Sequence, residues 1–228
     1  MKNLISVAVF LLLCQALFAQ GRNPITADQA IERLKEGNRR FVQGKTIHPR
    51  QSPERIREVA KGQKPFAIIV GCADSRVPNE IIFDEGLGDL FIVRTAGQVS
   101  AAASFGSIEF AEAVLGTNLI VVLGHTECGA VAAACNYQKT VPGHIITLVN
   151  NIKPAVMTVE RLVRQGKIAQ KDLVNETVKQ NVLMQVEQLR NLEPILSEAV
   201  RSGRTKIVGA VYHLATGVVE FLPETLNP

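Results

Sequence analysis

Residues 67–83 read AIIVGCADSRVPNEIIF, an apolar run that changes character at Gly71. Directly after the glycine come Cys72, Asp74 and Arg76, residue types that bind metal ions or hold and move protons. A short apolar run rich in β-branched residues is typical of a buried strand. The stretch therefore predicts a core strand whose carboxyl end carries a functional site.

Two more runs of this kind lie downstream, and all three are apolar on both faces, which is typical of interior parallel strands. They are Phe66–Gly71, Leu90–Arg94 and Asn118–Gly124. Between the last two, the segment ASFGSIEFAEAVLG places apolar residues at a helical period, namely Phe105, Ile108, Ala111 and Leu115. Strand, helix, strand is the βαβ pattern of an α/β layer.

The third run ends as the first one does. Residues 121–131 read VVLGHTECGAV, so His125 and Cys128 follow the strand directly. If the strand order is 2-1-3, the first and third strands are neighbours, and open parallel sheets bind ligands at their carboxyl ends. Cys72 and Asp74 would then meet this second pair of residues at one edge of the sheet.

The segments before the first strand predict a helix and an exposed connection. Residues 26–44 have helical periodicity and open with a possible capping box formed by Thr26 and Gln29. Residues 48–65 are charged and contain three prolines, which indicates an exposed connection with one short helix.

The segments after the third strand complete the expected fold. Two long helices are predicted at 146–166 and 173–192, the first interrupted near Pro154. Two strand-like runs around LATG (214–217) then indicate a hairpin. The expected fold class is α/β, with a central, mostly parallel sheet of order 2-1-3-4, an antiparallel edge strand and flanking helices.

The first residues have the pattern of a secretory signal peptide. Lys2 precedes an uncharged apolar run over 4–13, and small residues precede a plausible cleavage point after Ala19. The run is shorter than the ~20 residues of a spanning helix, which argues against an uncleaved anchor. We expect residues 1–19 to be the signal peptide and 20–228 a single domain, exported to the periplasm or secreted and not attached to a membrane.

Charge and aromatic content argue against a nucleic-acid partner. The formal net charge is +4 and acidic and basic residues are interspersed, so no basic stripe marks a phosphate-binding face. The chain has no Trp and two Tyr, which leaves no surface for stacking of bases.

The cysteines point to a metal site. Signal removal would take Cys14 and leave Cys72, Cys128 and Cys135, an odd number that cannot form a complete set of disulfides. Free thiols in an oxidising compartment need protection by burial or by a metal. We interpret Cys135, beside three alanines, as a buried helix residue.

Two thiolates, an imidazole and an oxygen form a recognised zinc ligand set, and soft sulfur ligands disfavour magnesium and calcium. The segment after His125 begins a predicted helix, whose N-terminal amides would stabilise Cys128 as a thiolate. The sequence therefore predicts a zinc site built from Cys72, His125 and Cys128, with Asp74 as a possible oxygen ligand.

Taken in order, these motifs resemble the β-class carbonic anhydrase family over most of the mature chain. The segments that carry the resemblance are CADSRVP, FIVRTAGQ, GSIEFA, GHTECGA and the C-terminal KIVGAVYHLATGVVEF. The resemblance implies that Cys72, His125 and Cys128 bind zinc. It also implies an Asp74–Arg76 dyad in which Asp74 can occupy the fourth zinc position.

The same resemblance implies three substrate-binding residues. Gln63 would reach the substrate from a dimer partner, and Phe91 and Phe110 would form apolar pocket walls. The chain is therefore expected to act as a homodimer or a higher homo-oligomer.

The resemblance implies reversible, zinc-dependent hydration of carbon dioxide to bicarbonate and a proton, by a zinc-bound hydroxide that Asp74 and Arg76 orient. Two alternatives stay open at this point. The scaffold could act on another small heterocumulene such as carbon disulfide, or it could be a closed structural zinc protein with Asp74 permanently on the metal. An assay of carbon dioxide hydration separates the enzyme from the structural protein.

Overall fold

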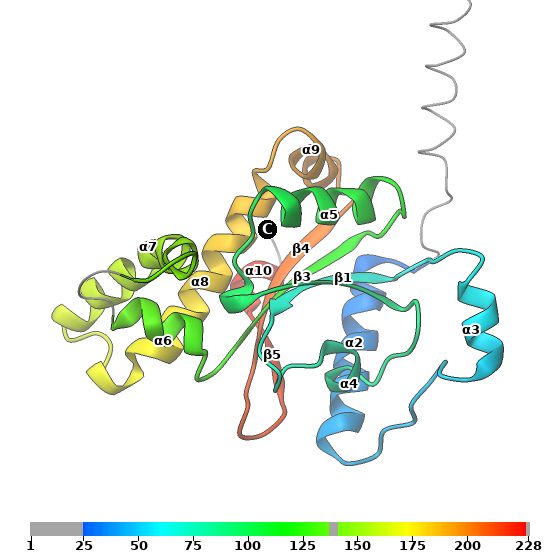
Figure 1. Cartoon of the computed structure of the whole chain (residues 1–228), viewed down its shortest axis with the longest axis horizontal. Coiled ribbons are helices and arrows are strands. Elements are labelled where there is room, and N and C mark those ends of the chain that lie inside the picture. The colour runs from blue at the N-terminus through cyan, green and yellow to red at the C-terminus, as the bar shows by residue number, and fades with distance from the viewer. Residues whose placement is uncertain (1–24, 137–140, 227–228) are drawn as a thin grey trace, which may run out of the picture.

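One five-stranded sheet organises the chain (Figure 1), in a computed structural model that describes residues 25–136 and 141–226. The strand order is β2-β1-β3-β4-β5; the first four strands are parallel, and β5 pairs antiparallel with β4 at the edge. This arrangement confirms the expected fold class. The strands are β1 (Ala67–Cys72), β2 (Leu90–Thr95), β3 (Leu119–His125), β4 (Lys206–Tyr212) and β5 (Val219–Phe221).

The register brings the two predicted strand ends together. β1 and β3 pair from Ile68↔Ile120 to Gly71↔Leu123. Both strands extend one residue further than the sequence predicts, so Cys72 and His125 are the last residues of neighbouring parallel strands. The segment that leaves β1 and the segment that enters β3 pack on opposite faces of the sheet. The carboxyl ends of β1 and β3 are therefore the topological switch point.

Helices cover both faces of the sheet (Figure 1). The N-terminal capping box is confirmed, because Thr26 and Gln29 exchange hydrogen bonds at the start of the first described helix. The helices are α2 (Ala27–Val42), α3 (Pro53–Val59), α4 (Asn79–Ile82), η1 (Ala96–Gln98), α5 (Ala102–Ala113), α6 (Gly129–Cys135), α7 (Ile145–Arg164), η2 (Gln170–Asp172), α8 (Leu173–Arg190), α9 (Ile195–Arg201) and α10 (Pro223–Leu226).

Two hydrophobic cores lie on opposite faces of the sheet because successive strand residues point to opposite sides. In β1, Ile68, Val70 and Cys72 face the core formed with α5 to α9. Ala67 and Ile69 face the core formed with α2 and α4. Cys72 therefore emerges on the face covered by α6, α7 and α8, which positions the site.

The predicted interruption of the first long helix near Pro154 is wrong. α7 runs from Ile145 to Arg164 without a break, although Pro154 has no N–H to donate to the carbonyl of Asn150. Burial of Ile152, Ala155 and Val156 on both sides of the proline holds the helix together.

The predicted signal peptide, residues 1–19, lies outside the residues that the structure describes. Within 25–136 and 141–226, none of the helices combines the length and the apolar character needed to cross a bilayer.

Candidate metal centre

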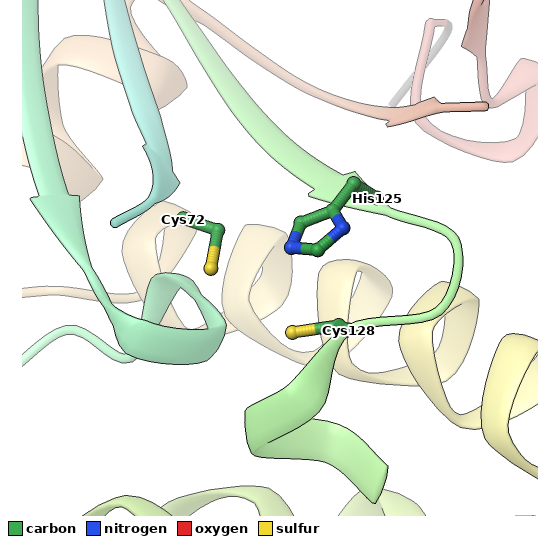
Figure 2. A group of neighbouring side chains, drawn as sticks. All are labelled: Cys72, His125 and Cys128. Atoms are coloured by element: carbon green, nitrogen blue, oxygen red, sulfur yellow. The ribbon is translucent and has the colours of Figure 1, made fainter. Parts of the chain in front are cut away.

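Cys72, His125 and Cys128 converge at the carboxyl edge of the sheet (Figure 2). One potential ligand atom from each residue lies within 4.8 Å of the other two. The three residues are 3%, 0% and 1% exposed, so the group is closed off from bulk water. The structure thus brings together the three ligands predicted from sequence.

Local structure explains how residues so far apart in the chain meet. Cys72 ends β1 and His125 ends β3, the neighbouring strand. The chain then turns through Glu127, whose φ of 53° is left-handed, and places Cys128 at the N-cap of α6. The backbone N–H groups of Val131 and Ala130 favour the Cys128 thiolate, although the side chain forms no capping hydrogen bond and the net shift of the Cys128 pKa is upward.

The pKa values of the two neighbouring thiols are displaced in opposite directions. The Cys128 thiol beside Cys72 is the main cause that lowers the pKa of Cys72 to about 4. The backbone N–H groups of Asp74 and Gly97 donate to the Cys72 sulfur, at 3.4 and 3.3 Å. The pKa of Cys128 is raised correspondingly, first because the Cys72 sulfur lies beside it and second because the thiol is buried.

His125 presents one nitrogen with no protein partner. Its Nδ1 lies 2.9 Å from the carbonyl oxygen of Thr126, so Nδ1–H donates and Nε2 carries the lone pair. Among the described residues, none hydrogen-bonds to the buried Nε2. Burial lowers the pKa of His125, but the neighbouring Cys72 sulfur, the Thr126 carbonyl and the Asp74 carboxylate outweigh burial, so the net shift is upward.

This donor set fits zinc. Zinc is bound in proteins by deprotonated cysteine sulfur and by neutral histidine nitrogen, and ligand histidines usually donate their other N–H to a carbonyl or carboxylate. Both thiols and the unpartnered Nε2 are present here, and Thr126 supplies the carbonyl. The three residues could therefore hold one zinc ion.

Asp74 is held by Arg76. The Arg76 Nε and Nη2 atoms donate to the two carboxylate oxygens at 2.9 and 2.7 Å, and the Arg76 backbone N–H donates at 2.9 Å. The side-chain hydrogen bond from Arg76 is the main reason that the pKa of Asp74 lies well below its usual range. Asp74 Oδ2 is 3.7 Å from His125 Nε2, so the carboxylate lies beside the three ligands and is directed to Arg76. Its role as a fourth zinc ligand stays a prediction.

Supporting residues that sequence reasoning missed surround Cys72. The N–H of Gly97 donates to the sulfur, and Asn181 Nδ2 donates to the Gly97 carbonyl at 3.1 Å. Gly97 has a φ of 67°, and a Cβ there would lie 2.8 Å from Ile152 Cδ1. Arg94 donates to the carbonyls of Cys72 and Asp74 at 2.8 and 2.7 Å. The small-residue loop TAG was a clue to Gly97, whereas no local pattern marked Asn181.

Within one chain, the three predicted substrate-binding residues are not brought to these ligands. Gln63 is exposed and precedes the amino end of β1, the opposite edge of the sheet from Cys72. Phe91 pairs with Ile68, about 13 Å along the strand from Cys72 at the usual rise per residue. Phe110 lies on α5 and is 46% exposed.

Cys135 lies outside the metal-binding group. It is the last residue of α6, its sulfur is 3.6 Å from the hydroxyl of Thr177, and burial raises the pKa of its thiol. It is half-buried, not fully buried as the sequence suggested, because it ends its helix.

Comparison with known proteins agrees with this geometry. Residues 67–219 match a family model described as "Carbonic anhydrase". The chain is 42% identical over 201 residues to a carbonic anhydrase of Mycolicibacterium smegmatis, covering 87% of this chain and 93% of the relative. It is 46% identical over 198 residues to carbonic anhydrase 2 of Mycobacterium tuberculosis, covering 86% and 91%.

Solved structures share the fold. The Coccomyxa β-carbonic anhydrase in complex with acetazolamide superimposes with a TM-score of 0.68 at 25% identity, covering 82% of this chain and 83% of that one. A tetrameric β-carbonic anhydrase from Sordaria macrospora superimposes with a TM-score of 0.69 at 24% identity, covering 86% and 98%.

Proposed function

This chain belongs to the β-class carbonic anhydrase family, and we propose that its reversible hydration of carbon dioxide to bicarbonate takes place at zinc held by Cys72, His125 and Cys128. The observation that carries this proposal is the convergence of two thiol sulfurs and an unpartnered imidazole nitrogen in a buried site. When bound, zinc lowers the pKa of a coordinated water and so makes hydroxide available at neutral pH.

The protein's own residues orient the reactants. Asp74 is ionised because Arg76 holds its pKa low, and its Oδ2 lies close to the ligand edge. We assign to Asp74 the acceptance of a hydrogen bond from the reacting water, which turns an oxygen lone pair toward carbon dioxide. Arg76 keeps the carboxylate in this orientation through its two parallel bonds.

The contribution of Asp74 and Arg76 to activating the water matters more at this site than at a site with three histidine ligands, because two thiolates neutralise the formal charge of zinc. A ligand set with two thiolates makes a weaker Lewis acid than three histidines do, so the surroundings must supply part of the activation. Arg76 and the N-terminal amides of α6 both lie beside the site and favour negative charge there.

A hydration assay on the purified chain, combined with elemental analysis, tests the proposal. We expect about one zinc per chain and a hydration rate that is lost when a chelator removes the zinc and restored when zinc is added back. Zinc without hydration would favour the closed structural protein. Carbon disulfide turnover without hydration would favour the heterocumulene hydrolase.

We further propose that each active site is completed by a second copy of the chain. The three residues that the resemblance implies for substrate binding lie away from the zinc ligands of their own chain. A symmetric partner could place its own copies of Gln63, Phe91 and Phe110 beside those ligands. A tetrameric relative of the same fold supports self-association. Gln63 would then bind substrate, and the two phenylalanines would form apolar walls, at the partner's zinc site.

A mixing experiment tests this arrangement. Gln63→Ala keeps its own ligands and Cys128→Ser keeps its own Gln63, so a mixed dimer contains one complete shared site. We expect each variant to be strongly impaired alone and a refolded equal mixture to recover about a quarter of the wild-type rate. No recovery, with mixed dimers confirmed by mass spectrometry, would show that each chain builds its site alone.

We also propose that the chain is exported after cleavage behind Ala19. The support is the sequence pattern of Lys2 and the apolar run over 4–13. Fractionation of expressing cells and mass measurement of the exported protein test it. A cytoplasmic protein that keeps residues 1–19 would contradict export.

A further inference from the structure

A second polar site lies in a cavity between the start of α5, the middle of α7 and the middle of α8. Its volume is about 260 Å³, whereas one water molecule occupies roughly 30 Å³ of liquid. Five carboxamide side chains line the cavity, and they are Asn150, Asn151, Asn181, Gln185 and Gln188. The cavity is therefore large enough for a small organic molecule and is rich in paired donors and acceptors.

The floor of the cavity is buried and contains unpartnered polar atoms. Ser100, Asn181 and Gln185 are 5%, 2% and 6% exposed. Within the described part of the chain, no group hydrogen-bonds to Ser100 Oγ or to Gln185 Oε1. Because buried polar atoms in folded proteins are almost always satisfied, these two atoms require a partner from beyond the described residues.

One wall supplies a further acceptor. Pro154 lines the cavity and cannot donate to the carbonyl of Asn150, so that carbonyl lacks its usual helical donor. Pro154 and Met184 also add apolar surface. The uninterrupted course of α7 through the proline thus leaves this carbonyl without the bond that it would accept in a regular helix.

The charge of the cavity selects the ligand. None of the side chains lining it, all within the described residues, is charged. An ion on the buried floor would lose part of its hydration without gaining a counter-ion, which is costly, whereas a neutral polar molecule exchanges one set of hydrogen bonds for another. Gln185 Oε1 needs a donor. Each amide NH2 group has two hydrogens, and although Asn181 gives one to Gly97 and Asn151 gives one to Thr147, hydrogens remain for an acceptor in the cavity.

We propose that this cavity binds a small uncharged molecule that carries both N–H donors and a carbonyl acceptor, of the primary carboxamide or urea class. The molecule donates to Gln185 Oε1 and accepts from the carboxamide NH2 groups, and Ser100 Oγ completes the set. Ordered water alone is the competing occupant.

The cavity is also connected to the metal centre. Asn181 belongs to its floor and donates to the carbonyl of Gly97, whose N–H donates to the Cys72 sulfur. A ligand on the floor therefore contacts a residue that supports a zinc ligand.

Titration of the zinc-loaded, isotope-labelled full chain with acetamide tests the proposal. We expect saturable chemical-shift changes in the side-chain amide signals of Asn181 and Gln185, with a dissociation constant in the millimolar range, as suits a ligand of about four heavy atoms. Sodium acetate has the same shape and a negative charge, and it should bind at least about tenfold more weakly.

Two variants locate the site. Gln185→Leu removes the buried acceptor at similar volume and should weaken acetamide binding at least about tenfold. Asn191→Ala changes a residue outside the cavity and should leave acetamide binding unchanged. Unaltered zinc content shows that each variant is folded, and Ser100→Ala replaces Gln185→Leu if the latter does not fold.

Three results would overturn the proposal. They are shifts that never saturate, equal binding by Gln185→Leu and the wild type, and binding of acetate as tight as that of acetamide. A crystal structure from acetamide-soaked crystals with only water in the cavity would do the same.

Discussion

Two of the regions in which the chain buries polar groups differ in how those groups are satisfied, and the difference shows which buried groups support the fold and which mark a ligand site. One region is the metal centre. The other, which we call the arginine cluster, joins α2 and the 45–50 segment to the loop after α4; it consists of Arg33, Arg40, Arg50, Asp84, Glu85 and Asp89. Both regions hold groups with displaced pKa values.

In the arginine cluster, every carboxylate has a guanidinium partner. Arg40 pairs with Asp84 at 2.6 Å, and Arg50 pairs with Asp89 at 2.6 Å. At the metal centre, by contrast, two neighbouring thiols have pKa values displaced in opposite directions, and the buried Nε2 of His125 has no hydrogen-bond partner among the described residues. A displaced pKa marks both regions, so it is the unsatisfied, converging atoms that indicate a ligand.

The largest effect is expected from Cys128→Ser, because removal of a thiolate leaves an incomplete zinc site. Zinc content and hydration should both fall to background. Elemental analysis per chain measures the first and a stopped-flow assay the second. Cys135→Ser is the matched control, since Cys135 lies outside the group, and equal zinc loss in the two variants would mean that the third ligand is misassigned.

Arg76→Ala should lower hydration by about 10–100-fold while zinc is retained, because Arg76 orients Asp74 and is not in the group of potential ligands. Arg76→Lys should recover only part of the rate, since lysine cannot form the two parallel bonds. Arg57→Ala removes an exposed arginine paired with Glu54 and serves as the control. A near-normal rate in Arg76→Ala would refute the dyad.

Within the arginine cluster, Asp84→Asn should lower the free energy of unfolding by about 1–2 kcal/mol and leave zinc content and hydration per folded molecule unchanged. Asp84 accepts from Arg40, Ile47 and His48 and is almost fully buried. Asparagine tolerates its left-handed φ of 46°. Urea unfolding measures the change in the free energy of unfolding. A loss of zinc in the folded variant would show that the arginine cluster and the metal centre are not independent.

The smallest effect concerns pH. Burial raises the pKa of Asp84, but Arg40 and the amides of Ile47 and His48 outweigh it, so the net shift is below the ordinary value. Because the pKa of Asp84 is lower in the folded state than in the unfolded chain, the Asp84 carboxylate stabilises the folded protein at pH values above its ordinary pKa. This stabilisation is lost as the pH falls through the pKa of the folded state. The stability gap between wild type and Asp84→Asn should be constant from pH 7 to 5 and narrow below about pH 4.

Paired urea titrations at each pH measure that gap. Glu85, whose pKa burial raises, is present in both proteins, so its contribution cancels. Loss of zinc in acid lowers the stability of the wild type and of Asp84→Asn alike, so it does not change the gap between them. A gap that widens in acid would mean that Asp84 is destabilising as a carboxylate.

Sequence reasoning succeeded where chemistry follows local pattern. Strands apolar on both faces predict a parallel sheet, and parallel strands end at a common edge, so the meeting of Cys72 with His125 could be foreseen. Cys128 followed because a His-x-x-Cys turn leads directly into a helix. The interruption at Pro154 was wrong because burial on both sides of the proline outweighs the missing hydrogen bond.

What local pattern could not reveal depends on segments that meet only after folding. Asn181 supports Gly97 because α8 packs across the ends of the sheet, and no feature of residues 173–190 announces that contact. The same holds for the unpartnered atoms of Ser100 and Gln185, which share one cavity although they lie on different elements. Hydrophobic periodicity specifies which face of a helix is buried, whereas the identity of its neighbour is settled by packing of the whole chain. The ligands, the parallel strands and the zinc chemistry were therefore predictable from the amino-acid order, whereas the strand order was an assumption that the structure confirmed. The residues that hold the ligands in place, and the second polar cavity, were decided by the packing of α7 and α8.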